Sequence, residues 1–319
     1  MITKAELHCH LEGSIPPALA RELALRNDLD LPAGLMGQDG FYVWKDFLSF
    51  LAAYDRVCQT LRTARDFGDV LYSYLAGAAR EGAVYVEMFC SPERPAALGI
   101  AYGAWLEALA AAIDRARRDF GIEGRIIIIC IRHRGPERAL AMARAMVAEP
   151  HRYVVGFGMG GDEAQFAPID FAPAYRLAHE HGFGCTVHAG EVRGPESVWA
   201  AIRDLPVTRI GHGVRSAEDP KLLDELARRG IVLEVCPGSN VALGLYPDRA
   251  AHPLHRLIEA GVRVTLNSDD PPFFHTTLGT EYDLAGLDEA ALRRIARTAV
   301  EASFADAATR QRLLGEMKP

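Results

Sequence analysis

The chain has 319 residues and a formal net charge of -7; 49% of its residues are hydrophobic and 24% are charged, as is typical of a globular protein. An acidic chain lacks the basic surface that nucleic acid requires, so we exclude nucleic acid as a partner and expect a small, neutral or weakly charged ligand. No apolar run reaches the roughly 20 residues of a membrane helix, and the N-terminus lacks a signal-peptide pattern, so we exclude a membrane and expect a cytoplasmic protein.

Short apolar runs rich in valine and isoleucine recur along the chain and predict eight β-strands. They span residues 5–12, 83–91, 125–133, 153–161, 184–191, 209–213, 231–236 and 262–269. Most of these runs are continuous rather than alternating, which is typical of strands buried on both faces of a parallel sheet. Amphipathic segments separate them and predict helices, for example over residues 103–120, 136–148, 171–181 and 220–229.

A strand followed by a helix, repeated eight times, predicts the α/β class and a (β/α)8 TIM barrel. The alternative is an open doubly wound sheet, which is disfavoured because no G-x-G-x-x-G follows the first strand. Residues 13–82 separate the first two strands, far more than one crossover needs, and predict extra helices inserted after strand one. Closing helices are expected from Asp288 onward, and we expect a single domain over residues 1–319.

The insertion contains an aromatic stretch at residues 41–57 (FYVWKDFLSFLAAYDRV). Following strand one, it would lie over the carboxyl end of the barrel. Its apolar side chains are either additional core packing or a lid over a flat aromatic substrate. The sequence leaves both interpretations open.

Metal-ligand and acid–base residues gather at the ends of predicted strands, which meet at one face of a parallel barrel. The first strand ends in His8 and His10, whose spacing of two residues points both imidazoles to the same side. Alone, such a pair is as often structural as functional. Here Glu12 and Gly13 follow at once, which favours a functional site.

Three further strand ends carry groups of the same kind. His188 precedes a tight Ala-Gly turn and Glu191, and His212 lies between two glycines. Asp269 adjoins Asp270, and two buried neighbouring carboxylates repel each other unless a cation lies beside one of them. Each group has a structural alternative: a hydrogen-bonded core histidine, a turn, or an Asp-Pro helix cap. Their joint position at strand ends favours a metal centre.

The donor set predicts one zinc ion per chain. Three imidazole nitrogens and one carboxylate oxygen, without a thiolate, suit zinc better than iron or manganese. The candidate ligands are His8, His10, His188 and Asp269. A water completes such a catalytic site, and we assign His212 to orienting that water. The fourth strand has no Lys, Cys or Glu that could bridge a second metal.

Six motifs together resemble the adenosine and adenine deaminases of the metal-dependent amidohydrolase superfamily. They are AELHCHLEGS (residues 5–14), MGGDE (159–163), HAGE (188–191), GHG (211–213), CPGSN (236–240) and NSDDP (267–271). The motifs stand in the family's order and span nearly the whole chain. The resemblance implies a zinc-dependent hydrolase that removes the 6-amino group of a purine and releases ammonia.

The resemblance also implies roles for individual residues. The zinc ligands correspond to His8, His10, His188 and Asp269. Glu191 corresponds to the acid that protonates N1 while hydroxide attacks C6, and His212 to the group that orients the hydroxide. Asp270 corresponds to the partner of N7, and the backbone N–H of Gly161 to the donor to N3. His10 and Glu12 are expected to bind the substrate, with Glu12 at the N9 substituent.

The sequence favours adenosine or deoxyadenosine as the substrate, with inosine or its deoxy form as product, because residues 188–199 (HAGEVRGPESVW) resemble the adenosine branch of the family. The alternative is adenine, or an adenosine derivative such as 6-aminodeoxyfutalosine, because Glu12 also occurs in relatives that act on the free base. Gly238 in CPGSN replaces the larger residue that is common there, which also leaves the N9 substituent open.

Other functions fit the sequence less well. A cytidine-deaminase zinc site needs P-C-x-x-C, which the chain lacks, although His10 and Glu12 form an H-x-E. A lactonase or phosphotriesterase would need a residue that bridges two metals. A non-catalytic barrel would be expected to have lost a metal ligand or Glu191.

Overall fold

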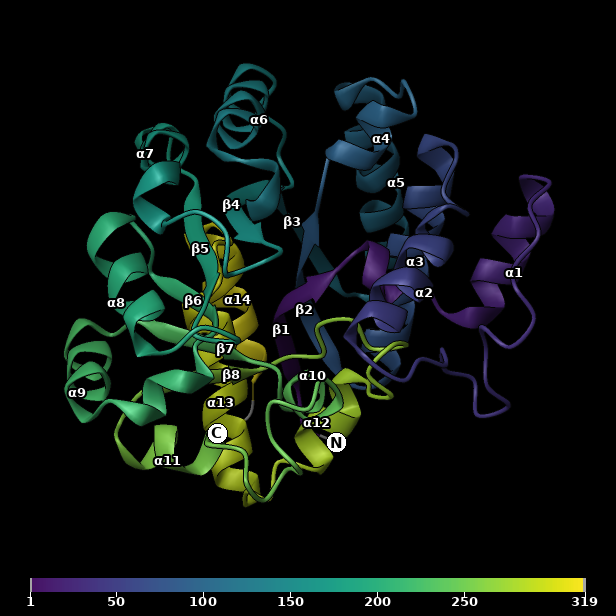
Figure 1. Ribbon diagram of the computed structural model, residues 1–319. Helices are drawn as coiled ribbons and strands as arrows, with labels where there is room; N and C mark the ends of the chain where they lie inside the picture. Colours follow the sequence, from purple (N-terminus) through teal and green to yellow (C-terminus); the bar gives the residue numbers. More distant parts are fainter. Residues whose placement is uncertain (1, 318–319) are drawn as a thin grey trace.

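The computed structural model describes residues 2–317, apart from the side chain of Phe47. Its eight parallel strands pair in chain order from β1 to β8 and confirm the predicted barrel (Figure 1). The strands are β1 (Lys4–His10), β2 (Ala83–Cys90), β3 (Glu123–Ile131), β4 (Val154–Gly160), β5 (Gly184–Ala189), β6 (Arg209–His212), β7 (Val232–Val235) and β8 (Arg263–Leu266). Seven of the eight have both ends within two residues of the predicted range, and β8 ends at Leu266, three residues before the predicted end.

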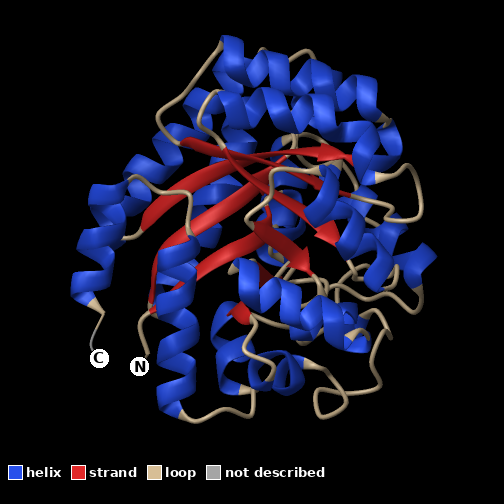
Figure 2. Ribbon diagram, turned by 90° about the vertical axis from the view of Figure 1, so that its left-hand side faces the viewer, coloured by secondary structure: helices blue, strands red, loops and turns tan. Residues whose placement is uncertain are grey.

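The barrel closes just beyond the end of β8. Cys9 of β1 forms a parallel bridge with Asp269. The backbone N–H of Asp269 donates to the carbonyl of His8 over 3.2 Å, and the N–H of His10 donates to the carbonyl of Asp269 over 3.0 Å. All strands therefore end at one rim, and the two chain ends lie at the opposite end of the barrel (Figure 2).

Helices surround the strands on the outside (Figure 2). They are α1 (Pro17–Arg26), α2 (Phe47–Cys58), α3 (Ala64–Arg80), α4 (Glu93–Ala97), α5 (Tyr102–Phe120), α6 (Pro136–Ala148), α7 (Ala172–Glu180), α8 (Pro195–Asp204), α9 (Pro220–Arg229), α10 (Pro237–Ala242), α11 (Leu254–Glu259), α12 (Leu278–Asp283), α13 (Glu289–Ala302) and α14 (Ala307–Glu316). Local sequence explains several boundaries: Thr63 caps α3 in a capping box, and proline opens α6, α8 and α9 at their first turns.

The insertion after β1 forms α1, α2 and α3, which lie together on one side of the barrel in Figure 1. The aromatic stretch 41–57 begins with an anchor to the segment after β8: Tyr42 stacks on Phe273 at 4.4 Å between ring centroids, and the Trp44 indole N–H donates to the Phe273 carbonyl over 2.7 Å. Asp46 then caps α2. Part of this stretch therefore packs into the core, as one of the two interpretations predicts.

The C-terminal helices complete the wall of the barrel. Helix α13 packs against β8 and β1 and so covers the seam where the barrel closes. Its Ala299 and Val300 belong to a buried cluster with Ala5 and Leu7 of β1. The predicted closing helices are therefore present in α13 and α14.

Phe304 fills the end of the barrel where the strands begin, opposite the rim that carries their carboxyl ends. A Cβ added at Gly184 would overlap its ring, and one at Gly156 would lie 2.8 Å from it. The Arg209 guanidinium lies 3.7 Å from the centre of the same ring and pairs with Glu87 at 2.6 Å and Glu234 at 2.7 Å. Gly156 on β4 and Gly184 on β5 thus leave room for the Phe304 ring.

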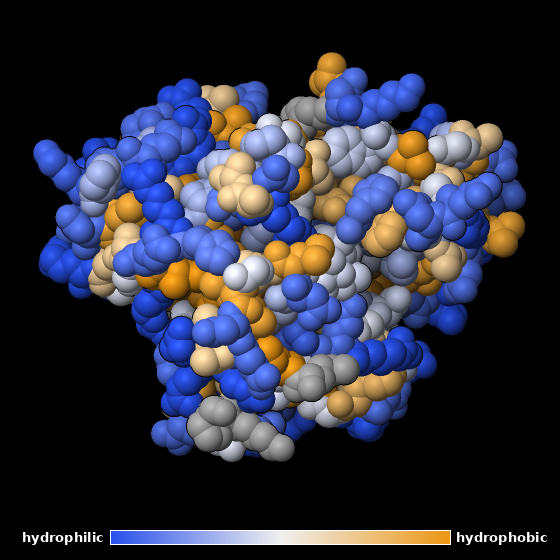
Figure 3. All heavy atoms as spheres, turned by 90° about the horizontal axis from the view of Figure 1, so that it is seen from below, coloured by the Kyte–Doolittle hydropathy of each residue, from blue (hydrophilic) through white to orange (hydrophobic). Residues whose placement is uncertain are grey.

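On the face seen in Figure 3, hydrophilic side chains surround hydrophobic ones that gather near the middle. Within residues 2–317, no helix combines the length and the apolar composition needed to span a bilayer.

We expect Gly184→Ala to destabilise the fold, because the added Cβ and the Phe304 ring would occupy the same space. Overpacking of this kind costs about 1–3 kcal/mol, and the Tm should fall by several degrees. Gly315→Ala is the matched control, since a Cβ there meets no atom within 4 Å. In a Phe304→Ala background, Gly184→Ala should have little effect; an equal loss of Tm in both backgrounds would contradict this packing.

Candidate active site

Four candidate residues meet at the rim where the barrel closes: His8, His10, His188 and Asp269. The Nε2 atoms of His10 and His188 are 3.2 Å apart, and Asp269 Oδ1 lies 3.3 Å from His10 Nε2 and 3.5 Å from His8 Nε2. Two zinc ligands at about 2.0–2.1 Å from a tetrahedral metal lie about 3.3 Å apart. These separations therefore fit four atoms arranged around one cation.

The buried ring of His8 supplies a test of that fit. Its Nδ1 lies 2.9 Å from Glu234 Oε2, while its Nε2 is buried without a hydrogen-bond partner. A buried polar atom in this condition is costly, and metal coordination removes the cost. The carboxylate at Nδ1 fixes the tautomer in which Nε2 can donate its lone pair. The site accordingly suits a divalent cation.

Cys236 also lies near this group, a neighbour that the sequence did not suggest. Its sulfur is within 4.8 Å of ligand atoms of His8, His212 and Asp269. Burial raises the pKa of the Cys236 thiol well above its usual range. Cys236 groups with His212 and Asp269 around His8, whereas His10 and His188 form a separate group with the same ring, so Cys236 lies apart from the cluster of three histidines.

Two non-glycine residues at the rim have left-handed backbone conformations: His212 with φ 57° and Asp269 with φ 62°. Such conformations cost about 1–3 kcal/mol each and concentrate at functional sites. The strand pairing aligns His188 of β5 with Gly211 of β6. A Cβ at Gly211 would lie 2.8 Å from the His8 ring, so this glycine makes room for the histidine.

Glu191 and His212 form an acid–base pair beside the four-residue group. Glu191 Oε2 lies 3.5 Å from His212 Nε2, which is 3.9 Å from Asp269 Oδ2. Burial raises the pKa of Glu191 well above its usual range, and the charge of Asp269 raises it further. Burial lowers the pKa of His212 to about 3. Near neutral pH the pair therefore combines a protonated carboxylic acid with a neutral imidazole.

The remaining candidate residues are Glu12, Asp270 and Gly161. Glu12 Oε1 and Asp270 Oδ1 are buried without hydrogen-bond partners. Burial and the charge of Asp269 raise the pKa of Asp270 to about 7. A Cβ at Gly13 would overlap the Asp270 carboxyl group, so the glycine of HLEG makes room for that side chain. Gly161 has φ 91° at the end of β4, a conformation that glycine adopts readily.

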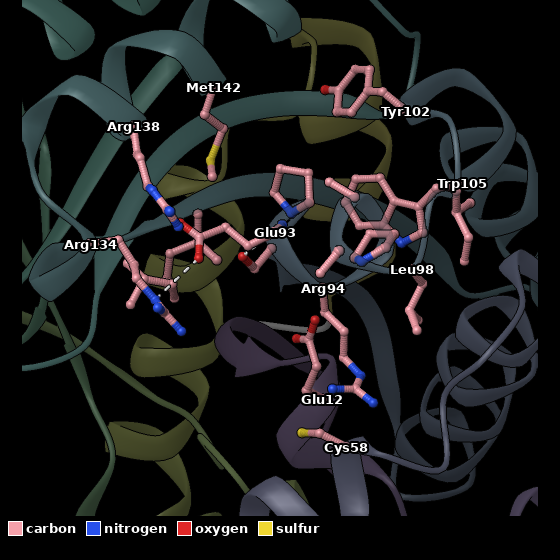
Figure 4. A pocket seen from close by; sticks show the side chains of 18 of the residues that line it. Glu12, Cys58, Glu93, Arg94, Leu98, Tyr102, Trp105, Arg134, Arg138 and Met142 are labelled. Atoms are coloured by element: carbon pink, nitrogen blue, oxygen red, sulfur yellow. Dashed lines mark hydrogen bonds and ion pairs between the residues drawn. The ribbon is translucent and has the colours of Figure 1, made fainter.

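A cavity of about 850 Å³ opens beside Glu12 and His10 (Figure 4). Tyr54 and Cys58 of α2 line it, and Trp105 of α5 faces it from another side. The stretch 41–57 therefore does more than pack the core, because α2 also forms a wall of the cavity. At the outer face of α2, Leu48 is 77% exposed.

The structure explains why glycine stands at position 238, where a larger residue is common in the family. A Cβ at this position would overlap Glu281 Oε1 and lie 3.0 Å from the Arg249 side chain. Arg249 and Glu281 form a bidentate ion pair with N–O distances of 2.8 and 2.9 Å. This pair occupies the space that a larger residue would need.

Several buried charged residues that position the site were absent from the sequence prediction. Glu234 holds His8, and Glu163 accepts hydrogen bonds from the turn that carries Glu191. Arg132 donates to the carbonyl of His188. A charged residue inside an otherwise apolar strand, such as Glu234 in IVLEVC, was the available signal.

A family model described as adenosine deaminase matches residues 3–319. The chain is similar to an adenine deaminase of Sinorhizobium medicae, at 45% identity over 320 residues that cover 99% of this chain and 98% of that protein. It is 46% identical to an adenine deaminase of a Chelativorans species, covering 100% of this chain and 99% of that one.

Two solved structures are also similar to this chain over nearly its full length. A crystal structure of adenine deaminase from Arthrobacter aurescens has a TM-score of 0.90 at 29% identity and covers 99% of this chain and 98% of its own. An amidohydrolase from Burkholderia ambifaria with bound Zn has a TM-score of 0.87 at 27% identity, covering 99% of this chain and 90% of its own.

We expect Glu234→Gln to weaken zinc binding by about 10–100-fold, because the neutral amide orients and polarises the His8 ring less well than the carboxylate does. Competition with a chromophoric chelator measures the affinity, and thermal unfolding verifies the fold. The control is Glu225→Gln, which alters a surface carboxylate paired with Arg228. Zinc affinity equal to that of the unaltered protein would show that Glu234 does not support His8 as a ligand.

Proposed function

The chain belongs to the adenosine deaminase family, and we propose that its substrate is the free base adenine, which it hydrolyses to hypoxanthine and ammonia. Like its relatives, it is an aminohydrolase that acts on the C–N bond of a cyclic amidine, and it deaminates a 6-aminopurine. The observation that carries the choice of adenine is the buried Glu12 carboxyl group, whose Oε1 has no hydrogen-bond partner.

The expectation that adenosine is the main substrate is not supported. Relatives that are 44–46% identical over nearly their full lengths are named adenine deaminases. The alternative, adenine, fits them better. The segment 188–199 suggested the adenosine branch, but it continues into α8, and none of its residues lines the cavity beside Glu12.

Glu12 supplies a physical reason for this preference. Free adenine has an N–H at N9 that a nucleoside lacks, and the unpaired Oε1 of the Glu12 carboxyl group can accept a hydrogen bond from it. A glycosidic carbon at N9 would leave Glu12 without that bond. A buried acceptor left unsatisfied costs about 1–3 kcal/mol, so the same group that binds the base disfavours the nucleoside.

We infer that one zinc ion is held by His8, His10, His188 and Asp269. The donor set, the free Nε2 of His8 and the Zn-containing relative from Burkholderia support this assignment. Zinc bound there would lower the pKa of a water molecule towards about 7 and so supply a nucleophile at neutral pH.

The side chains around the purine complete the reaction. Glu191 donates its proton to N1 as water oxygen adds to C6. This proton stabilises the intermediate that forms when the ring loses its aromaticity. His212, which is neutral, accepts a proton from the attacking water. Protonated Asp270 donates to N7, and the Gly161 backbone N–H donates to N3. The amino group then takes up the proton held by His212, the C6–N bond breaks and ammonia leaves. The proton of the C6 hydroxyl returns to Glu191, which leaves hypoxanthine with its C6 carbonyl and a proton on N1.

We expect kcat/KM for adenine to exceed that for adenosine and for 9-methyladenine by about 10–100-fold, since only adenine donates a bond from N9 to Glu12. Glu12→Ala should lower kcat/KM for adenine by about 10–100-fold and affect 9-methyladenine far less. Ammonia release and chromatography of the products provide the measurements.

Glu93→Gln is the matched control, because this carboxyl group lines the same cavity and also has a buried, unpaired Oε1, but its Oε2 pairs with Arg134 over 3.6 Å. It should leave the order of substrates unchanged. A higher kcat/KM for adenosine than for adenine in the unaltered enzyme would contradict the proposal.

A further inference from the structure

The turn that follows β5 is held by a single carboxyl group. Residues 190–193 are not part of a helix or strand, yet their four successive backbone N–H groups all donate to Glu163. The distances are 3.2 Å from Glu191, 2.8 Å from Val192 and 2.9 Å from Arg193. The Ser197 hydroxyl adds a fifth hydrogen bond over 2.6 Å. This turn carries the acid that the reaction needs.

Glu163 is suited to hold that turn rigidly. It is only 7% exposed, and hydrogen bonds to an ionised acceptor are about twice as strong as neutral ones. Its two oxygens divide the donors, with Gly190 and Ser197 on Oε1 and the other three on Oε2. An amide in its place would offer one acceptor oxygen and turn an N–H₂ toward the remaining donors.

The position of Glu163 along the chain links two sides of the substrate site. It lies two residues after Gly161, beyond the end of β4, whereas Glu191 follows β5. In the proposed pose, Gly161 contacts N3 of the purine and Glu191 contacts N1. The carboxyl group of Glu163 therefore joins the two segments that face the N1–C2–N3 edge.

We propose that Glu163 is a positioning residue that fixes Glu191 against N1 of the purine by binding the backbone of residues 190–193. The inference rests on the proposed role of Glu191. It assigns no contact between Glu163 and the substrate. A displacement of about 1 Å in a reacting group can cost about 100-fold in rate, so the effect of losing this anchor should be large.

Hydrogen exchange of the metal-loaded protein tests the anchor without any substrate. In the unaltered protein, amides in a peptide covering residues 190–197 should exchange slowly. Glu163→Gln should accelerate their exchange by at least about 10-fold, because the four N–H groups lose their charged acceptor. The matched control is Glu196→Gln, which changes an exposed carboxyl group that accepts one backbone N–H in the same segment, from Gly194 over 3.2 Å. Exchange in Glu163→Gln as slow as in the unaltered protein would overturn the proposal.

Kinetics then separate positioning from general stability. With the 6-aminopurine that the unaltered enzyme hydrolyses fastest, Glu163→Gln should lower kcat by about 10–100-fold, with KM changed by less than about 3-fold and metal content unchanged. Gly184→Ala, destabilised at the far end of the barrel, should keep its kcat below its unfolding temperature. Unchanged kcat in folded, metal-loaded Glu163→Gln would overturn the proposal.

A double substitution tests whether Glu163 acts through Glu191. If it does, adding Glu163→Gln to Glu191→Gln should cause little further loss in residual kcat, because the group being positioned is already gone. Multiplicative losses would contradict the proposal. Should Glu163→Gln fail to fold, Glu163→Asp is the second variant, because it withdraws the carboxyl group by one methylene. We expect Glu163→Asp to lower kcat as well, by a smaller factor. Failure of adenine as a substrate would overturn the proposed function alone, since the exchange result stands without it.

Discussion

The closure of the barrel between β1 and β8 is the contact on which the site depends. Two backbone hydrogen bonds tie Asp269 to His8 and His10, residues that lie more than 250 positions earlier in the chain. Side chains reinforce the seam: Asn267 accepts from the β1 backbone over 2.9 Å, and Glu6 accepts from the backbone of the segment after β8 over 2.6 Å. The carboxylate and the two imidazoles can share a cation only because this seam forms.

Buried charges beneath the rim keep these groups in place. Glu234 binds His8 on one oxygen and Arg209 on the other, and Arg209 continues to Glu87 and to the Phe304 ring. Burying such charges costs solvation energy, and their mutual attraction offsets that cost only when every partner is present. The benefit is a fixed orientation of the His8 ring. The histidine ring therefore depends on residues that reach the opposite end of the barrel.

The sequence predicted the elements whose signals are local. Continuous valine- and isoleucine-rich runs located the strands to within three residues, and the ends of four runs placed the histidines and the Asp269–Asp270 pair at one rim. Pairing across strands has no such local signal, so the anchor Glu163 was missed. Glu234 stood out as a charge within an apolar strand, but the sequence did not identify its partner His8. In the proposed function, the choice between adenosine and adenine depends on Glu12 in a cavity that the β1 end, α2 and α5 line, and a motif near β5 does not report on that cavity.

Zinc K-edge absorption spectroscopy of the metal-loaded protein tests the central claim most directly, because it measures which atoms surround the ion. The expected result is one zinc per chain with nitrogen and oxygen neighbours at about 2.0–2.1 Å, including the outer-shell scattering of three imidazole rings. A sulfur neighbour at about 2.3 Å would place Cys236 among the ligands, and fewer than three imidazoles would separate the histidines from the metal; either result would contradict the account.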